Sequence, residues 1–176
     1  QNLVKARLFR MMQAATNPNL LTIPLKNFAS IEGFNPDDVP EDSTLIADVL
    51  QYSANEIPAK FIKAKEIIEA IISSGGKVVV WAIYIKNILD FAEYLLNCGI
   101  PCKTLYGATP VATDGMSIED EGYEETREGI IKTFHREDSP FKVIIANPFA
   151  VAESISLHKV CHNAIYLERS FNCAHF

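Results

Sequence analysis

The sequence predicts an α/β protein with a parallel β-sheet. Two apolar runs, residues 143–146 and 164–167, are rich in β-branched residues and too short for helices. Neither run alternates with polar residues, which is typical of strands covered on both faces. From residue 59 onward, helical and strand patterns follow each other in turn. This alternation is typical of parallel strands joined by right-handed crossovers.

The N-terminal third of the chain is less regular. Residues 3–15 place apolar side chains at helical spacing, and an Asn-Pro pair ends that pattern. Residues 20–40 contain turn formers without a sustained period, so we expect a loop there. Residues 43–52 are compatible with a short helix that a serine caps. We therefore predict a helical and loop appendage over residues 1–57 and a compact domain over residues 58–176.

The compact domain contains the regular elements. We expect strands at 77–84, 102–106, 143–146 and 164–167, and helices at 59–73, 85–97 and 123–134. The second of these helices has an apolar stripe that we expect to be buried: Ile85, Ile88, Leu89, Ala92, Leu95 and Leu96. Residues 111–122 lack such a pattern, and we expect an exposed excursion there.

Composition narrows the class of protein. The chain has 176 residues, 48% of them hydrophobic, and no apolar run long enough to span a membrane. It begins at Gln1 without a secretion signal, so we expect a fragment of a longer cytoplasmic protein. The net charge is −6, but two acidic patches at 37–42 and 119–128 dominate it. Because local fields matter more than the total, this charge is neutral evidence about nucleic acid.

The cysteines and histidines do not form a metal-binding pattern. His158, Cys161 and His162 lie close together, yet no second close pair of usual spacing follows. We therefore expect no metal site. We also expect reduced thiols rather than disulfides at all four cysteines: Cys98, Cys102, Cys161 and Cys173.

Candidate ligand contacts lie where strands end, because ligands bind at the carboxyl edge of open α/β sheets. The turn Gly107-Ala108-Thr109 follows a strand and exposes backbone amides, which can hold a DNA phosphate without reading base sequence. An ordinary strand-to-helix turn is the alternative. Asn147-Pro148 ends a strand at the same edge, where the asparagine could donate to a phosphate or cap the loop.

A second candidate segment holds hydroxyl groups and a carboxylate. Glu153, Ser154 and Ser156 could meet a ribose or phosphate, or the hydroxyls could cap a short helix. Arg127 lies in an acidic run, and we expect its side chain to be solvated among neighbouring carboxylates rather than catalytic.

The order of these pieces resembles a known family. The segments that carry the resemblance are a helix ending in Asn-Pro-x-Leu, a strand at 77–84, a glycine turn at 105–109, an Arg-to-Phe helix at 127–134, and the runs 143–157 and 163–172. Together they resemble the C-terminal RecA-like lobe of superfamily-two helicases. Within that superfamily the chain is most similar to the Swi/Snf-like DNA translocases, including their bacterial relatives.

The resemblance implies a role within an ATP-driven motor. It implies DNA contacts at the turn and at Asn147-Pro148, with RNA left open, and nucleotide contacts at Glu153, Ser154 and Ser156. The partner would be the N-terminal RecA-like lobe of the same parent chain. ATP and Mg²⁺ would bind the full-length parent and not this fragment. A stand-alone doubly wound module that binds a nucleotide or a protein is the alternative.

The resemblance has two departures. The family's fifth motif usually carries glycines and an Asn or Asp, whereas Ala152, Ser154 and Ser156 stand in this run. The chain also ends before the sixth motif, which would supply an arginine finger. It has no phosphate loop, and no Asp-Glu pair for magnesium follows any of the predicted strands. We therefore expect this fragment alone to hydrolyse no ATP.

The predicted boundary is testable by hydrogen exchange read by mass spectrometry. Segments with few buried apolar contacts open at low free energy, so amides in 20–57 should exchange early. Amides in the strand segments 78–82, 144–146 and 165–167 should exchange last. Comparable protection in 20–57 and in these strands would mean that the appendage is an integral part of the domain.

Overall fold

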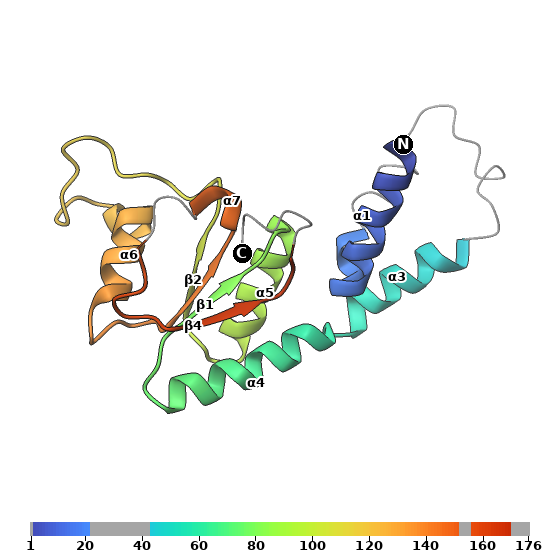
Figure 1. Ribbon diagram of the computed structural model, residues 1–176, viewed down its shortest axis with the longest axis horizontal. Helices are drawn as coiled ribbons and strands as arrows, with labels where there is room; N and C mark the ends of the chain where they lie inside the picture. Colours follow the sequence, from blue (N-terminus) through green and yellow to red (C-terminus); the bar gives the residue numbers. More distant parts are fainter. Residues whose placement is uncertain (1, 22–42, 152–155, 170–176) are drawn as a thin grey trace. The chain divides into compact units, whose positions relative to one another are not determined.

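The computed structural model describes residues 2–21, 43–151 and 156–169 (Figure 1). The chain divides into two compact units, Gln1–Ile62 and Lys63–Phe176, and the division falls inside the helix α4 (Ala59–Ser73). The predicted boundary between residues 57 and 58 stays a prediction. Within the described residues, none of the helices has the length and apolarity that a bilayer span requires.

The first unit contains helices that pack around a short 3₁₀ turn. Its elements are α1 (Asn2–Thr16), η1 (Pro18–Leu21), α3 (Ser43–Asn55) and the start of α4. Leu20 in η1 and Val49 in α3 are buried. The Lys60 ammonium donates to the Thr16 hydroxyl at 3.1 Å, which ties α4 to α1. Residues 22–40 of the loop predicted over 20–40 lie outside the described residues.

The second unit is built on a parallel sheet of four strands in the order β2-β3-β1-β4. The strands are β1 (Val78–Trp81), β2 (Cys102–Leu105), β3 (Val143–Ala146) and β4 (Asn163–Tyr166). All four residues of β3 are buried, which confirms the expected strand covered on both faces. The same expectation for β4 is wrong. As an edge strand with one partner, it leaves Ala164 and Tyr166 exposed.

Helices cover the two faces of the central strands. On one face, Ile130 and Phe134 of α6 (Arg127–His135) join a cluster with Val79 and Ile144. Because side chains of a strand alternate between faces, Val78 and its like-facing neighbours point to the other side. The helix α5 (Ile85–Asn97) contacts β2 and β3. A short helix, α7 (Pro148–Val151), follows β3 directly.

The buried face of α5 differs from the predicted stripe. Ile88, Ala92 and Leu95 are buried as expected, and so are Asn87 and Phe91. The expectation is wrong for three other apolar residues, which are 45% to 55% exposed: Ile85, Leu89 and Leu96. The true stripe is thus centred about one position away from the predicted one, because an apolar side chain on the exposed side of a helix has the same sequence signature as a core residue.

The helix predicted over 123–134 is interrupted by a cap. A 3₁₀ turn, η3 (Tyr123–Glu125), ends at Thr126, whose backbone is extended. The Thr126 hydroxyl oxygen accepts from the Gly129 N–H at 3.1 Å and so caps α6, which begins at Arg127.

A buried lysine fastens the other end of α6 to the sheet. Lys77 precedes β1, and its ammonium donates to the carbonyls of Phe134 and Arg136 at 2.5 and 2.6 Å. Carbonyls at a helix C-terminus lack partners within the helix and favour a cation there. Burial lowers the pKa of Lys77, yet these two acceptors replace its lost hydration. The two ends of α6 are therefore both fixed by side-chain contacts.

Close packing of η3 against α6 predicts that Gly129→Ala destabilises the domain. An added Cβ would stand 2.0 Å from the Tyr123 carbonyl oxygen and 2.9 Å from the Glu124 Cα. The helix propensity of alanine favours the variant by about 1 kcal/mol, so a net loss of about 1–3 kcal/mol in urea denaturation would show that overpacking dominates.

Gly107→Ala is the matched control, because no heavy atom lies within 4 Å of its added Cβ. We expect its free energy of unfolding to change by about 0.5 kcal/mol or less. A stable Gly129→Ala protein would contradict the packing described here.

Candidate nucleic-acid interface

The register of the sheet brings the carboxyl ends of its strands into one row. Trp81 lies opposite both Ala146 and Tyr166, and Leu105 lies opposite Ala146. The Asn147 N–H donates to the Leu105 carbonyl at 2.8 Å and joins two of these ends. The structure thus brings together the predicted contacts that follow β2 and β3: Gly107, Ala108, Thr109, Asn147 and Pro148.

The turn after β2 is closed from inside by Thr109. The buried Thr109 hydroxyl accepts from the Tyr106 N–H at 3.0 Å and donates to the Thr104 carbonyl at 3.4 Å. The Thr109 N–H also donates to the Tyr106 carbonyl at 3.0 Å. Gly107 and Ala108 are exposed, and no described residue accepts a hydrogen bond from either of their N–H groups. The turn therefore presents free backbone donors, whereas the Thr109 side chain shapes it.

Arg127 supports this turn, and the expectation that it is solvated among carboxylates is wrong. Its guanidinium donates to the carbonyls of Tyr106 at 3.1 Å and Gly107 at 3.4 Å. It also donates to Thr109 at 3.3 Å and to Ala150 at 3.1 Å. The reason is the Thr126 cap, which makes Arg127 the first residue of α6 and so places its side chain beside the turn.

Asn147 uses its side chain within the protein. Its Nδ2 donates to the Ile83 carbonyl at 2.9 Å, and its Oδ1 accepts from the Phe149 N–H at 2.9 Å. Asn147 itself is only 7% exposed. These contacts are those of the loop-capping alternative. They fix the end of β3 to the junction between β1 and α5, and Pro148 then begins α7.

Glu168 is a residue of this edge that the sequence reasoning missed. It follows β4 and is buried, and its Oε2 accepts from the Ile83 N–H at 2.7 Å. Its Oε1 accepts from the side-chain amide of Asn87 on α5. The Asn147 side chain donates to the Ile83 carbonyl, so both polar groups of the Ile83 backbone are hydrogen-bonded to side chains from neighbouring strand ends. An acidic residue directly after an apolar strand is the signal that could have indicated it.

The predicted nucleotide segment is only partly described. Glu153 and Ser154 lie outside the described residues. Ser156 is exposed, and its hydroxyl lies 3.0 Å from the Nδ1 of His158. The Ser156 carbonyl lies 3.0 Å from the Nε2 of His135, at the end of α6. The ribose, phosphate and capping interpretations of this segment stay open.

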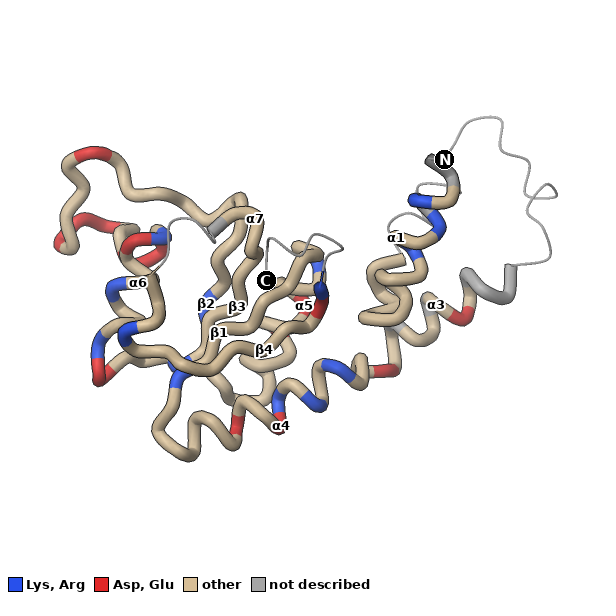
Figure 2. Tube along the Cα trace, viewed as in Figure 1, with Lys and Arg blue, Asp and Glu red and all other residues tan. Residues whose placement is uncertain are grey.

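Acidic residues gather on the excursion between β2 and α6 (Figure 2). Asp120 on this excursion accepts from the Ser117 N–H at 2.5 Å, and Glu128, in the first turn of α6, accepts from the Ala112 N–H of the excursion at 2.8 Å. A groove of about 290 Å³ lies beside the turn, and its Lys103 and Glu125 form an ion pair at 2.8 Å. The lysine charge is therefore balanced within the protein.

The described cysteines are free thiols. Burial raises the pKa of Cys102 to about 11 and also raises the pKa of Cys161. Both groups therefore stay protonated near neutral pH and are poor nucleophiles and metal ligands. Among residues 2–21, 43–151 and 156–169, no three His, Cys, Asp or Glu side chains gather as metal ligands.

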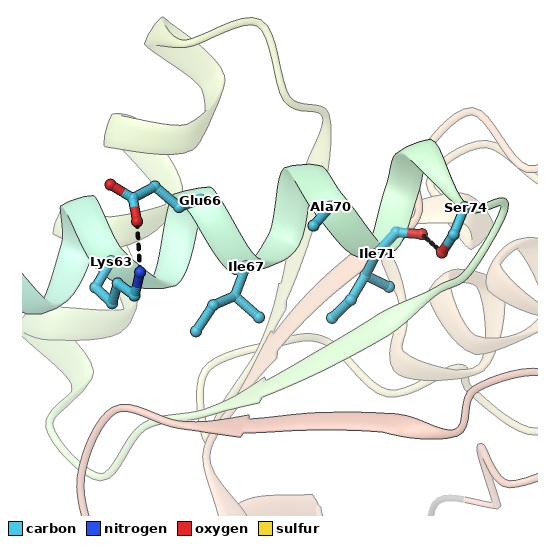
Figure 3. A pocket seen from close by; sticks show the side chains of 6 residues that line it. All are labelled: Lys63, Glu66, Ile67, Ala70, Ile71 and Ser74. Atoms are coloured by element: carbon cyan, nitrogen blue, oxygen red, sulfur yellow. Dashed lines mark hydrogen bonds and ion pairs between the residues drawn. The ribbon is translucent and has the colours of Figure 1, made fainter.

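A second hollow runs along α4 (Figure 3). It has a volume of about 450 Å³, and the side chains of one helix face line it, including Ile67 and Ile71. Its polar residues are already paired: Lys63 with Glu66 at 2.7 Å, and the Ser74 hydroxyl with the Ile71 carbonyl at 2.8 Å. α4 leads to the amino end of β1, so its end lies away from the edge that carries the candidate site.

Comparisons with known proteins identify the fold. No family model and no curated protein sequence matches the chain. Among solved structures, the helicase domain of Hef from Pyrococcus furiosus matches with a TM-score of 0.62 and 17% identity, covering 92% of this chain and 32% of that one. The C-terminal part of the Fun30 ATPase domain matches with a TM-score of 0.54 and 18% identity, covering 93% of this chain and 58% of that one.

These matches confirm the predicted fold class. The second unit has the α/β architecture with a parallel sheet that RecA-like helicase domains share. The two neighbours are a helicase domain and the C-terminal part of an ATPase domain, and at 17% and 18% identity the likeness concerns the fold. The chain spans about a third of the first neighbour and over half of the second.

The contacts around Ile83 predict coupled losses of stability. Glu168→Ala and Asn147→Ala each leave a polar group of Ile83 without its partner, and each should lower the free energy of unfolding by about 1–3 kcal/mol. Since both side chains hold the same residue, the double variant should lose less than the sum, by about 0.5 kcal/mol or more. Urea denaturation measures all three. Glu93→Ala on the exposed side of α5 is the control, and strict additivity would contradict the shared role.

Proposed function

We propose that this chain is the C-terminal motor lobe of an ATP-dependent DNA translocase or helicase of the Swi/Snf-like kind. The observation that carries this proposal is the pair of exposed backbone N–H groups, on Gly107 and Ala108, at the carboxyl edge of a RecA-like sheet. Backbone donors bind phosphate oxygens without base information, which is what a motor that moves along any sequence requires. The helicase and ATPase neighbours support the ATP-driven part.

The proposal implies a longer, cytoplasmic parent protein with a second RecA-like lobe. That lobe would hold most of the ATP and Mg²⁺, because this sequence has no phosphate loop, and its Asp-Glu pair, Asp120-Glu121, lies in the excursion after β2 and not at the end of a strand. Glu153, Ser154 and Ser156 would complete the nucleotide site from this side. DNA would pass over the turn after β2 and the end of β3. RNA is the alternative ligand that the binding assays compare with DNA. This chain alone would hydrolyse no ATP.

Gly107 allows a direct test of the phosphate contact. An added Cβ meets no heavy atom within 4 Å, and the glycine does not have a positive φ, so both aspartate and asparagine fit the position. Gly107→Asp sets a carboxylate against the phosphate. We expect the Kd of the full-length protein for DNA to rise about tenfold, which corresponds to about 1.4 kcal/mol, and to rise equally for unrelated sequences. Fluorescence anisotropy measures it.

Gly107→Asn is the control, since it has the same shape without the charge, and it should bind nearly as well as the wild type. An unchanged Kd in Gly107→Asp would refute the phosphate contact. A loss confined to one DNA sequence would instead indicate a base contact. Binding of single-stranded and double-stranded DNA and RNA by the wild-type protein then identifies the preferred nucleic acid.

A further inference from the structure

We propose that Arg127 is the positioning residue of the proposed DNA contact at Gly107 and Ala108. From inside the protein it holds the turn after β2 so that the N–H groups of Gly107 and Ala108 face a DNA phosphate. The ligand in this inference rests on the proposed function. The positioning itself can be tested without DNA.

Peptide geometry links the arginine to the outward donors. In a trans peptide, the carbonyl of one residue and the N–H of the next point in opposite directions, and the described chain has no cis peptide bond. The Arg127 Nη2 draws the carbonyls of Tyr106 and Gly107 toward itself at 3.1 and 3.4 Å. The N–H groups of Gly107 and Ala108 must therefore point away from the arginine, and both residues are exposed.

The same guanidinium also holds the segment after β3. Its Nη1 donates to the Ala150 carbonyl in α7 at 3.1 Å, and its Nε donates to Thr109 at 3.3 Å. The donors of a guanidinium form a rigid planar fork, so carbonyls bound to it keep a fixed mutual arrangement. One side chain thus joins the two segments that carry the predicted DNA contacts.

The position of Arg127 in its helix supports this role. A cation at a helix N-terminus faces the positive end of the helix dipole, which is unfavourable. Acidic residues surround it in the sequence, yet none of the ion pairs in the described part of the chain includes it. Its backbone N–H donates to the Pro110 carbonyl at 2.8 Å. The backbone and the side chain of Arg127 therefore both bind the turn. The partners of its guanidinium are backbone carbonyls and not carboxylates.

Hydrogen exchange of Arg127→Met in the full-length protein tests the positioning. The hydrogen-bonded amides of the two joined segments, those of Tyr106, Thr109, Asn147 and Ala150, should exchange about tenfold faster than in the wild type, while those of β1 stay unchanged. Arg136→Met is the matched control, because it removes one positive charge as Arg127→Met does, but at the C-terminal end of α6. Among described side chains, Arg136 pairs only with the exposed Asp138. This control should leave both segments protected. Equal protection in Arg127→Met and the wild type would overturn the proposal.

DNA binding separates positioning from direct contact. Arg127→Met should raise the Kd for DNA about tenfold. The dependence of its Kd on salt concentration should equal that of Arg136→Met, because neutral amide donors release no counterions. If Arg127 itself contacted a phosphate, the slope of log K against log salt would shrink by about 0.9 relative to that control, and the positioning role would be wrong. Arg127→Lys keeps the charge but only part of the fork and should be intermediate in both exchange and Kd. It also serves as the test if Arg127→Met does not fold.

The two proposals fail in different ways. If the wild-type protein binds no nucleic acid, the proposed function is wrong, and the exchange measurement still decides whether Arg127 positions the two segments. If the wild type binds DNA but Arg127→Met binds equally well, the positioning role is wrong and the proposed function stands.

Discussion

The pairing of β3 with its two neighbours is the constraint on which the candidate site depends. Every side chain of β3 is buried, and the strand is hydrogen-bonded to β2 on one side and to β1 on the other. A slip of one residue would move each of these side chains to the opposite face, so the register is fixed by packing on both faces. The segments that follow Leu105, Ala146 and Trp81 consequently start from fixed positions in one row.

Polar side chains then convert this row into a rigid edge. Buried polar groups need partners, and here they find them in the backbone of neighbouring strand ends. Asn147 and Glu168 hold the two polar groups of Ile83, while Arg127 holds carbonyls of the turn after β2. The side chains that looked available for a ligand are thus engaged within the protein. The donors left at the surface belong to the backbone, which agrees with the proposed binding of phosphates without sequence preference.

Local sequence patterns were sufficient for the fold and for the sheet edge along which the predicted contacts lie. The apolar run of β3 and the alternation of elements indicate a parallel sheet, and the rule for strand ends then places the turn at Gly107. The pattern of α5 could not distinguish Leu89, which is exposed, from Leu95, which is buried, because both lie within one broad apolar stripe. The side-chain contacts that support the candidate site could not be predicted from the sequence either. Glu168 and Ile83 are 85 residues apart in the chain, and only the folded sheet brings them together.

Arg127 shows how one local feature can reverse an interpretation. Its neighbours are acidic, and a continuous helix over 123–134 would set it among carboxylates at helical spacing. The Thr126 cap breaks that helix and turns the arginine toward backbone carbonyls instead. The same arrangement reconciles a net charge of −6 with the proposed DNA partner. Amide donors are neutral dipoles that need no surrounding lysines, and the guanidinium on the inner side of the turn acts by holding the carbonyls that orient them.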